Sequence, residues 1–322
     1  MAIIQQNTAN LARLANVLDL SAKPESKYRR LKRFLSGASL DSVIFARLMV
    51  AIIKPSGKYV LALDRTEWKY GVVWVNILTL SIVVGNTSIP LFWQTLNRKG
   101  NSTLAEKRAI IDRYLEVFDV AEIGYFCADR EFDGLEFVKY LDEKRVPFRL
   151  RVKVLMPITN KNGKLMKCGK LLRTLKIGEN YKLKRARKYG GVRVYVEVAR
   201  GRDTKESVIV ISSENTGKIL LEYKRRWAIE TLFQNLKSRG FELEETHLTE
   251  AGKIDKLFGV LALAAAWAVK TGEMESAENA IEIKKNGRAQ KSLFRLGCEI
   301  IQEVLFEIKR HSKVNIFEIL RC

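Results

Sequence analysis

Apolar residues recur at helical spacing near the start of the chain. Residues 10–20 read NLARLANVLDL and residues 39–53 read SLDSVIFARLMVAII, and in both segments the apolar positions return every three or four residues. This spacing places them on one side of a helix, where they can face a core. Residues 1 to about 55 are therefore predicted to be helical.

From residue 58 the pattern changes to short apolar runs of the kind that form strands. YVLALD spans residues 59–64, VVWVNILTLSIVV spans 72–84 and TSIPLFWQTL spans 87–96. Gly85 and Asn86 separate the last two runs, and this dipeptide is typical of a tight hairpin turn. The sequence predicts an antiparallel meander of three strands.

Helices and strands alternate after the meander. A helix begins at Thr103, where Glu106 three residues later completes a capping-box pattern. An apolar strand at 123–128, a helix at 134–144 and a strand at 148–153 follow. The order strand, strand, strand, helix, strand, helix, strand indicates an α/β fold with a ribonuclease H-like sheet.

Residues 154 to about 215 interrupt this alternation, because their turns are rich in Gly, Asn and Lys and their valines alternate from Val192 to Val198. We predict a β-rich insertion here. A strongly helical stretch returns at about 217–239, and helices fill the remainder of the chain. The predicted domains are a helical DNA-binding module at 1–55, a catalytic core at 56–153, the β-rich insertion at 154–215, the final core helix at 216–250 and a C-terminal helical region at 251–322.

The charge balance indicates a polyanionic partner. In the sequence 57 Lys and Arg face 36 Asp and Glu, which leaves a formal net charge of +21. A phosphate backbone binds such a surface because its counterions are released. Nucleic acid is the simplest partner, although an ordinary basic protein has the same balance.

A predicted helix after Pro24 carries a basic cluster that is a candidate DNA contact. A solvated helix face is an equally good interpretation of the same residues. The candidate DNA-binding residues of this cluster are Lys27, Arg29, Arg30, Lys32 and Arg33.

Neither the cysteines nor the apolar segments indicate an extracellular or membrane protein. Cys127, Cys168, Cys298 and Cys322 lie far apart and form no CxxC pair, so no zinc site or disulfide framework is predicted. The longest apolar run, at 257–269, is too short to span a bilayer and predicts a buried helix. The N-terminus lacks the pattern of a signal peptide. We expect a cytoplasmic protein with no membrane partner.

Two aspartates each close an apolar strand. Asp64 ends YVLALD, and Asp129 follows IGYFCA. Sites in α/β sheets form where strands emerge, so both are candidate catalytic residues. A single aspartate after a strand is more often part of a turn or a helix cap. The arginines that follow them, Arg65 and Arg130, make the two positions alike and favour a shared role.

The helix predicted at 217–239 brings a third carboxylate. At about 100° per residue, one side of it presents a hydroxyl, a carboxylate and two cations within roughly one sixth of the circumference. For the helix alone, a solvated amphipathic face is the simpler interpretation. The residues on this side are Tyr223, Arg226, Glu230 and Lys237. The apolar residues of another face are Leu221, Ile229, Leu232 and Leu236.

Together, Asp64, Asp129 and Glu230 have the chemistry of a phosphoryl-transfer site. Carboxylates can hold two cations about 3.5–4 Å apart on either side of a scissile phosphate. One ion lowers the pKa of the attacking water or 3′-hydroxyl, and the other stabilises the leaving oxygen. Oxygen ligands favour two Mg²⁺ ions, with Mn²⁺ as a substitute.

The same helix carries a specific motif. Residues 223–237 read YKRRWAIETLFQNLK, which resembles the Tyr-x2-Arg-x3-Glu-x6-Lys signature of DDE transposases of the insertion-sequence-four family, related to the transposon-five and transposon-ten enzymes. All four residues and all three spacings agree. The blocks DRTEW at 64–68 and ADREF at 128–132 look like those around the two aspartates of that family. The resemblance extends over about residues 25–305.

The resemblance implies roles for six residues. Those that match the metal-binding triad are Asp64, Asp129 and Glu230. Those that match residues gripping phosphates of the non-transferred strand at the transposon end are Tyr223, Arg226 and Lys237. The implied activity is cut-and-paste transposition of an insertion sequence at a prokaryotic nucleoid, through 3′-end nicking, a hairpin on the transposon end, hairpin opening and strand transfer. The implied partners are double-stranded DNA, as terminal inverted repeats and target, and a second copy of the chain.

Two other interpretations remain open on the sequence. One is a ribonuclease H-like nuclease that hydrolyses nucleic acid without strand transfer. The other is a non-catalytic, DNA-binding descendant of a transposase. The intact triad and the complete Tyr-Arg-Glu-Lys set argue against the second of these.

Overall fold

The chain forms two compact units. The computed structural model describes residues 1–18, 21–96, 98–203, 206–285, 287 and 289–310. One unit contains Met1–Lys54, Trp68–Val73 and the chain from Leu232 onward, and the other contains Pro55–Glu67 and Trp74–Thr231.

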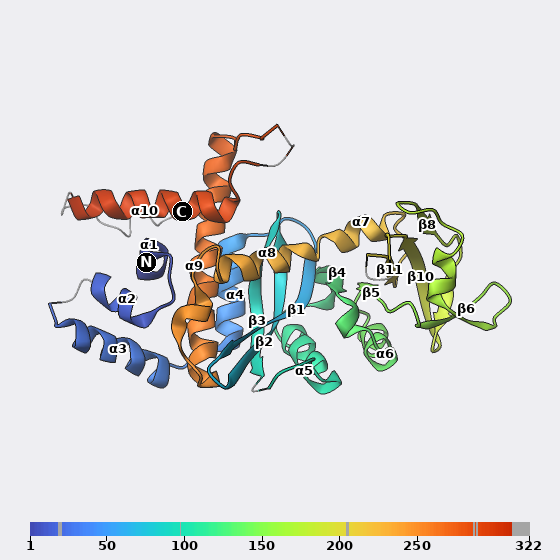
Figure 1. Cartoon of the computed structure of the whole chain (residues 1–322), viewed down its shortest axis with the longest axis horizontal. Coiled ribbons are helices and arrows are strands. Elements are labelled where there is room, and N and C mark those ends of the chain that lie inside the picture. Colours follow the sequence, from blue (N-terminus) through green and yellow to red (C-terminus); the bar gives the residue numbers. More distant parts are fainter. Residues whose placement is uncertain (19–20, 97, 204–205, 286, 288, 311–322) are drawn as a thin grey trace. The chain divides into compact units, whose positions relative to one another are not determined.

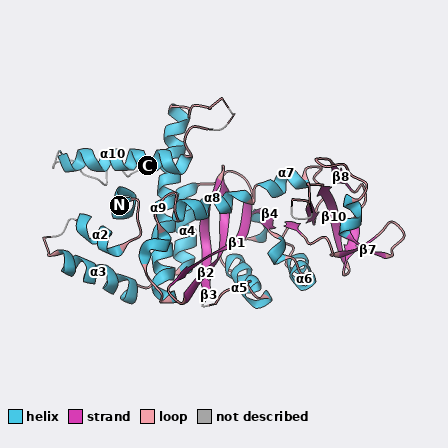
Figure 2. Cartoon of the chain, viewed as in Figure 1, coloured by secondary structure: helices cyan, strands magenta, loops and turns pink. Residues whose placement is uncertain are grey.

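A large mixed sheet dominates the second unit, and helices accompany it (Figure 2). Its strands follow the order β3-β2-β1-β4-β5-β11-β10-β8, and β9 pairs with β10. The strand bounds are β1 (Tyr59–Tyr70), β2 (Val73–Val84), β3 (Thr87–Leu96), β4 (Ile123–Ala128), β5 (Phe148–Arg151), β8 (Asn180–Lys182), β9 (Arg187–Tyr189), β10 (Val192–Ala199) and β11 (Val208–Ser212).

The first three strands form the predicted meander. β2 and β3 pair antiparallel from Val84 and Thr87 outward, around a turn in which Gly85 has a φ of 55°. Gly71, with a φ of 58°, occupies the turn between β1 and β2. Glycine adopts positive φ without steric cost, so it allows the tight turns that join these closely spaced apolar strands.

The next two strands add to the meander in parallel. β4 pairs parallel with β1, and β5 pairs parallel with β4. Parallel neighbours need long crossovers, and these contain α5 (Leu104–Leu115) and α6 (Leu135–Glu143), which lie side by side in Figure 1. The predicted capping box at the start of α5 is confirmed, because the side chain of each partner, Thr103 and Glu106, accepts a hydrogen bond from the backbone of the other.

Most strands of residues 154–215, β8 to β11, continue the same sheet. β11 pairs antiparallel with β5, and β10 pairs antiparallel with β11. The inward-facing valines of β10 are buried, as the alternation in the sequence predicts: Val192, Val194, Val196 and Val198. A separate two-stranded sheet joins β6 (Pro157–Thr159) to β7 (Leu165–Lys167).

Helices build the other unit, and the predicted helical character of residues 1–55 is confirmed. The N-terminal helices pack with those near the C-terminus: the Gln302 amide donates to the Ile4 carbonyl, and Lys256 donates to the Ser36 carbonyl. The helix bounds are α1 (Ala2–Gln6), α2 (Leu11–Val17), α3 (Pro24–Gly37), α4 (Ser42–Ile53), α9 (Ala251–Glu278) and α10 (Leu293–Arg310).

The helix α9 contains the longest apolar run of the sequence. By length and composition it could cross a membrane, but 61% of its most apolar window is buried inside the protein. Phe258, Leu261 and Ala262 are fully buried in it. The prediction of a buried helix at this run is confirmed.

Three cysteine side chains, those of Cys127, Cys168 and Cys298, are buried free thiols. Burial raises the pKa of each to about 12, so these thiols stay protonated at neutral pH. Cys322 lies outside the described residues.

Two glycines allow α9 and α10 to approach closely. A Cβ atom on Gly297 would lie 1.7 Å from the carbonyl oxygen of Ala268, and one on Gly272 would lie 2.0 Å from that of Leu293. These neighbours are backbone atoms of the opposite helix, so they cannot rotate away. Both positions therefore require glycine for the helices to pack as they do.

We predict that Gly297→Ala lowers the free energy of unfolding by about 1–3 kcal/mol, because the added methyl group forces the two helices apart. Thermal unfolding followed by circular dichroism measures this. Gly252→Ala in α9 is the matched control, since a Cβ there meets nothing within 4 Å and alanine favours a helix. Equal melting temperatures for Gly297→Ala and the wild type would contradict the close packing.

Candidate active site

Asp64 lies inside a strand and not at its end, which corrects the prediction from the sequence. β1 continues to Tyr70, but its parallel partner β4 ends at Ala128, and the last register pair is Leu63 with Ala128. Asp64 and Asp129 therefore follow this pair on adjacent strands, which lie about 4.8 Å apart in a sheet. The two aspartates are neighbours because of this register.

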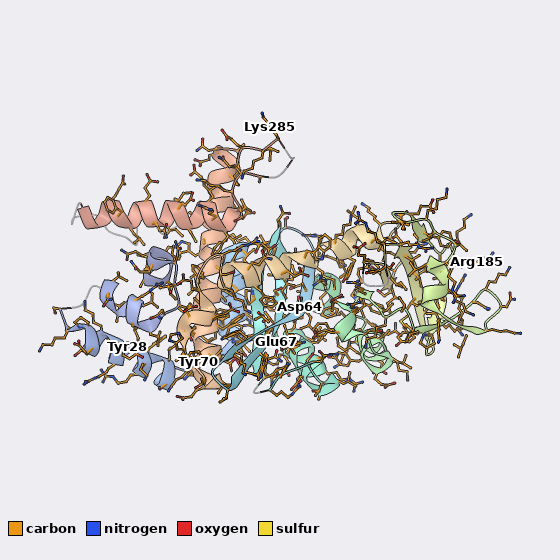
Figure 3. The ribbon with its side chains drawn as sticks, viewed as in Figure 1. Tyr28, Asp64, Glu67, Tyr70, Arg185 and Lys285 are labelled. Atoms are coloured by element: carbon orange, nitrogen blue, oxygen red, sulfur yellow. The ribbon has the colours of Figure 1, made fainter. Side chains whose placement is uncertain are left out.

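Arg65 connects the segments around the two aspartates. Its guanidinium donates to the Glu131 carboxylate at 2.8 Å and to that of Glu67 at 2.9 Å, and it also reaches the Asn101 side chain. Figure 3 shows Asp64 and Glu67 close together along β1. The sequence showed an arginine after each aspartate but not that Arg65 pairs with the second segment.

The predicted continuous helix at 217–239 is in fact two helices, which corrects a second prediction. α7 (Ile219–Lys224) and α8 (Trp227–Leu236) are separated by Arg225 and Arg226. Across this break, backbone hydrogen bonds span three residues, from Ala228 to Arg225 and from Ile229 to Arg226. This tighter spacing is that of a 3₁₀ turn.

The break changes which side chains are buried. Leu221, expected on the apolar face, is 61% exposed. The other predicted apolar positions, Ile229, Leu232 and Leu236, are buried. Arg226, expected on a polar face, is only 4% exposed. The helical segment thus buries a cation that an uninterrupted amphipathic helix would leave in water.

Arg226 joins two of the predicted catalytic carboxylates. Its guanidinium donates to Asp64 at 3.1 Å and to Glu230 at 2.5 Å, while its Nε donates to the Tyr223 hydroxyl at 3.0 Å. Every one of these partners was predicted as a site residue from the sequence. A buried guanidinium with such partners offsets the repulsion between nearby carboxylates.

The third predicted carboxylate, that of Asp129, is linked to Arg226 through Tyr223. The Tyr223 hydroxyl donates to Asp129 at 3.2 Å. Burial raises the pKa of Tyr223 well above its usual value, so the hydroxyl keeps the proton that it donates. Arg151, from β5, also approaches Asp129, at 3.5 Å. The sequence did not single out Arg151.

A buried ion pair fixes α7 on the sheet. Arg149 of β5 is 1% exposed, and it donates to Glu222 at 2.6 Å and to Glu214 at 3.0 Å. Glu222 directly precedes Tyr223, so this pair positions the hydroxyl that reaches Asp129. An arginine inside the apolar run FRLR is the signal in the sequence that indicates such a buried pair.

Lys237 and the N-terminal basic cluster belong to the helical unit. Lys237 follows α8, where it pairs with Glu244 at 2.7 Å and lies over the Trp68 ring at 5.3 Å. On α3, Arg29, Arg30, Lys32 and Arg33 are exposed, while Lys27 is half-buried and donates to the Leu18 carbonyl. Exposure suits both a DNA contact and a solvated face.

The environment of Asp64 disfavours its charge. Burial raises the pKa of this carboxyl from a usual value near 3.8 to about 7, even though Arg226 and the Arg65 backbone N–H act in the opposite direction. Strongly shifted carboxyls are typical of functional sites. Glu230 is more accessible, with half of its side chain exposed.

The donor set suits a hard divalent cation. Asp64, Asp129 and Glu230 offer carboxylate oxygens, and one hydrogen-bonded group, Arg226 with Tyr223, touches all three. Such oxygens match Mg²⁺ or Mn²⁺ and not zinc or copper. Within the described residues, no three His, Cys, Asp or Glu side chains converge closely enough to hold a metal ion as they stand. Arg226 supplies the positive charge between Asp64 and Glu230.

Comparison with known families decides the class of protein. The profile of the family described as transposase DDE domain matches residues 55–267, which include all three carboxylates. The chain belongs to this family. DDE domains have a ribonuclease H-like fold, and the mixed sheet with its helices agrees with that assignment. DDE domains also act on DNA as transposases and generally use divalent metal ions.

Other comparisons add little to the DDE assignment. A search of curated proteins finds no significant match. Among solved structures, an endonuclease V from Bacillus subtilis is similar, with 13% sequence identity, a TM-score of 0.25, and coverage of 75% of this chain and 96% of that chain. At this TM-score the likeness has no bearing on function.

We predict that Asp64 lowers the stability of the metal-free DDE protein as the pH rises from about 4 to about 7. The folded chain keeps the Asp64 proton up to about pH 7, whereas the unfolded chain releases it near 3.8. The folded state therefore binds more protons in this window, and raising the pH favours unfolding. Asp64→Asn removes this contribution.

Melting temperatures in EDTA between pH 4.5 and 8 test this prediction. The wild type should lose stability relative to Asp64→Asn as the pH rises. Glu278→Gln, a change at an exposed carboxylate, should track the wild type at every pH. Parallel curves for the wild type and Asp64→Asn would show that Asp64 has no raised pKa.

Proposed function

We propose that the chain is a DNA transposase that moves an insertion sequence by cut-and-paste transposition, and that it belongs to the insertion-sequence-four group. The hydrogen-bonded group centred on Arg226 supports this proposal best. It joins Asp64, Asp129 and Glu230 to the tyrosine and arginine of the Tyr-Arg-Glu-Lys signature. A generic nuclease needs the carboxylates but not this signature.

Asp64, Asp129 and Glu230 would hold two Mg²⁺ ions, or Mn²⁺ in their place. Two such ions activate an attacking oxygen and stabilise the leaving oxygen of a phosphodiester. Asp64 would contribute from β1, Asp129 from just after the end of the adjacent β4, and Glu230 from the helix α8. The proposed reaction sequence is 3′-end nicking, a hairpin on the transposon end, hydrolytic opening of the hairpin that restores the 3′-hydroxyl, and strand transfer.

Arg226, Tyr223 and Lys237 would hold phosphates of the transposon end. Both terminal guanidinium nitrogens of Arg226 now bind carboxylates, so a phosphate must replace at least one of these bonds. Arginine suits this exchange because its planar donors match carboxylate and phosphate oxygens alike. Lys237 would add a point charge. The cations of α3 are proposed to bind DNA as well: Lys27, Arg29, Arg30, Lys32 and Arg33.

The proposed partners are double-stranded DNA and a second copy of the chain. The terminal inverted repeats and the target are both duplexes, and the net charge of +21 favours binding to their backbones. Two active sites are needed to join two ends, so we propose a homodimer in the complex with paired ends. Proteins of this family are typically soluble and cytoplasmic, and the same compartment, at the prokaryotic nucleoid, is proposed here.

Strand transfer is the activity that separates the proposal from its alternatives. Pre-cleaved transposon-end DNA with a 3′-hydroxyl, a target plasmid and Mg²⁺ should give joined products with the wild type. We predict that Asp64→Ala, Asp129→Ala and Glu230→Ala each abolish cleavage and joining while end binding persists, because each removes a metal ligand. Gel electrophoresis of labelled DNA measures products, and a mobility shift measures binding.

The outcomes distinguish three functions. Cleavage without joined products would indicate a nuclease, and binding without either reaction would indicate a non-catalytic descendant. Retained cleavage in one of the alanine variants would remove that residue from the triad. Glu278→Ala, at an exposed carboxylate of α9, is the control that should keep full activity.

We predict that Arg226→Ala and Lys237→Ala each weaken binding to transposon ends and lower its dependence on salt. A lost phosphate contact reduces the slope of log affinity against log salt by about one. Titrations at several salt concentrations measure this slope. Lys161→Ala, at an exposed residue, should leave it unchanged, and unaltered slopes for both site variants would refute a phosphate role.

A further inference from the structure

The β-rich insertion contains a cavity that the proposed reaction does not use. It has a volume of about 450 Å³ and lies near the end of β10 (Figure 1). This volume is within the range of pockets that bind small molecules. None of the residues that line the cavity belongs to the triad or to the Tyr-Arg-Glu-Lys signature.

Three segments of the insertion form the walls of this cavity. They are the chain after β5, the 3₁₀ turn at Cys168–Leu172 and the loop between β10 and β11. The Gly169 N–H donates to the Val154 carbonyl at 2.8 Å, and a Cβ atom on Gly169 would lie 3.0 Å from that oxygen. A Cβ atom on Gly201 would lie 2.3 Å from the Cβ of Glu206. The backbone around the cavity is therefore closely packed.

The cavity has a strong excess of positive charge. Five cations line it and face a single carboxylate, that of Asp203: Lys167, Lys170, Arg173, Arg200 and Arg202. None of the five forms an ion pair within the part of the chain that the structure describes. Like charges that are held close together repel one another, and a bound anion relieves this repulsion. The ligand that suits the cavity is thus anionic.

One of the five cations is already fixed in position. The Arg200 guanidinium donates through Nη1 to the Leu172 carbonyl at 3.1 Å and to the Leu175 carbonyl at 2.7 Å. Its Nε and Nη2 have no hydrogen-bond partner among the described residues. These two nitrogens form the kind of planar fork that binds two oxygens of one phosphate. Because the side chain is held before a ligand arrives, little conformational entropy is lost on binding.

The number of cations indicates more than one phosphate. A phosphate monoester carries about two negative charges at most, and the arginine fork alone would serve one such group. The other four cations are exposed, so they can turn toward a longer chain of phosphates. A polyphosphate therefore matches the charge of the cavity better than a single phosphate does.

The apolar wall and the carboxylate indicate what the phosphates are attached to. Leu155 lines the cavity and is 64% exposed, next to the buried Leu172. An inorganic polyphosphate would leave Leu155 in water and would place Asp203 beside a like charge. A nucleoside avoids both problems, since its ring can cover an apolar side chain and carboxylates accept hydrogen bonds from ribose hydroxyls in nucleotide sites.

We propose that this cavity binds a ribonucleoside polyphosphate, with the phosphates held by Arg200 and its neighbouring cations and the ribose held by Asp203. The proposal is independent of the proposed function, because the two sites share no residue. DNA lacks the 2′-hydroxyl that Asp203 would recognise. The cavity would thus make the protein responsive to a small molecule as well as to DNA.

Isothermal titration calorimetry of the full chain with ATP, dATP and AMP tests this proposal. EDTA excludes metal-bridged binding, and about 0.15 M salt screens weak contacts between exposed charges. ATP should bind at one molecule per chain. AMP and dATP should each bind about 10- to 150-fold more weakly, which corresponds to roughly 1.5–3 kcal/mol for a lost hydrogen bond to a charged group.

Variants of exposed residues locate the binding site. Arg173→Ala combined with Arg202→Ala should weaken ATP binding by about tenfold or more, because both cations face the cavity. Lys161→Ala combined with Lys164→Ala is the matched control. It removes the same charge from exposed positions of the same insertion outside the cavity, and it should bind ATP as the wild type does. Asp203→Ala should remove the preference for ATP over dATP.

Three results would overturn the proposal. The first is the absence of ATP binding by the wild type. The second is an equal loss of affinity in the cavity variant and in its matched control, which would show that ATP responds only to the overall charge. The third is equal affinity for ATP and dATP together with a lower salt slope for duplex DNA in the cavity variant, which would identify a DNA phosphate contact instead. A chain that binds ATP as expected but fails in strand transfer would refute the proposed function and leave this site intact.

Discussion

The buried charge of Arg226 is the interaction on which the candidate site depends. Three carboxylates in a partly desolvated place repel one another, and burial alone would keep Asp64 protonated. Arg226 binds Asp64 and Glu230 directly and reaches Asp129 through Tyr223. The break between α7 and α8 coincides with this burial: Arg226 is buried, while its two chain neighbours, Arg225 and Trp227, are exposed.

A second constraint sets the position of the two aspartates. They are adjacent because β1 and β4 pair in parallel up to Leu63 and Ala128. Arg65 then fixes the segments beyond this pair through Glu131. A slip of one residue would turn Asp64 to the opposite face of the sheet, where Arg226 could not reach it. The register and the arginine pairs are therefore mutually dependent.

Much of the fold follows from local patterns. The meander, the alternation of helices and strands, and the capping box at Thr103 were predictable because each depends on residues close in sequence. Strand and helix placement also singled out Asp64, Asp129 and Glu230 as candidates. The structure brings them to one hydrogen-bonded group, and their catalytic role stays a prediction. Long-range partners were not predictable. The sequence does not show that Arg65 pairs with Glu131, and the strand position of Arg149 indicates a buried pair without identifying Glu222 as the partner. The helix break was missed because uniform helical periodicity continues through Arg226, and only tertiary burial of that side chain interrupts it.

The position of Asp64 within β1 has a further consequence for how the site can adapt. On one side the strand is held by β2, while on the other its ladder with β4 has just ended. An aspartate in a loop could shift with its loop, but this one belongs to a continuous strand and has little freedom. Glu230 is half exposed and lies just after a helix break. The sheet thus holds Asp64 in a fixed position, whereas Glu230 on the helix α8 has more freedom to move. When the site takes up ions or DNA intermediates of different shape, the adjustment therefore falls to Glu230 and its helix.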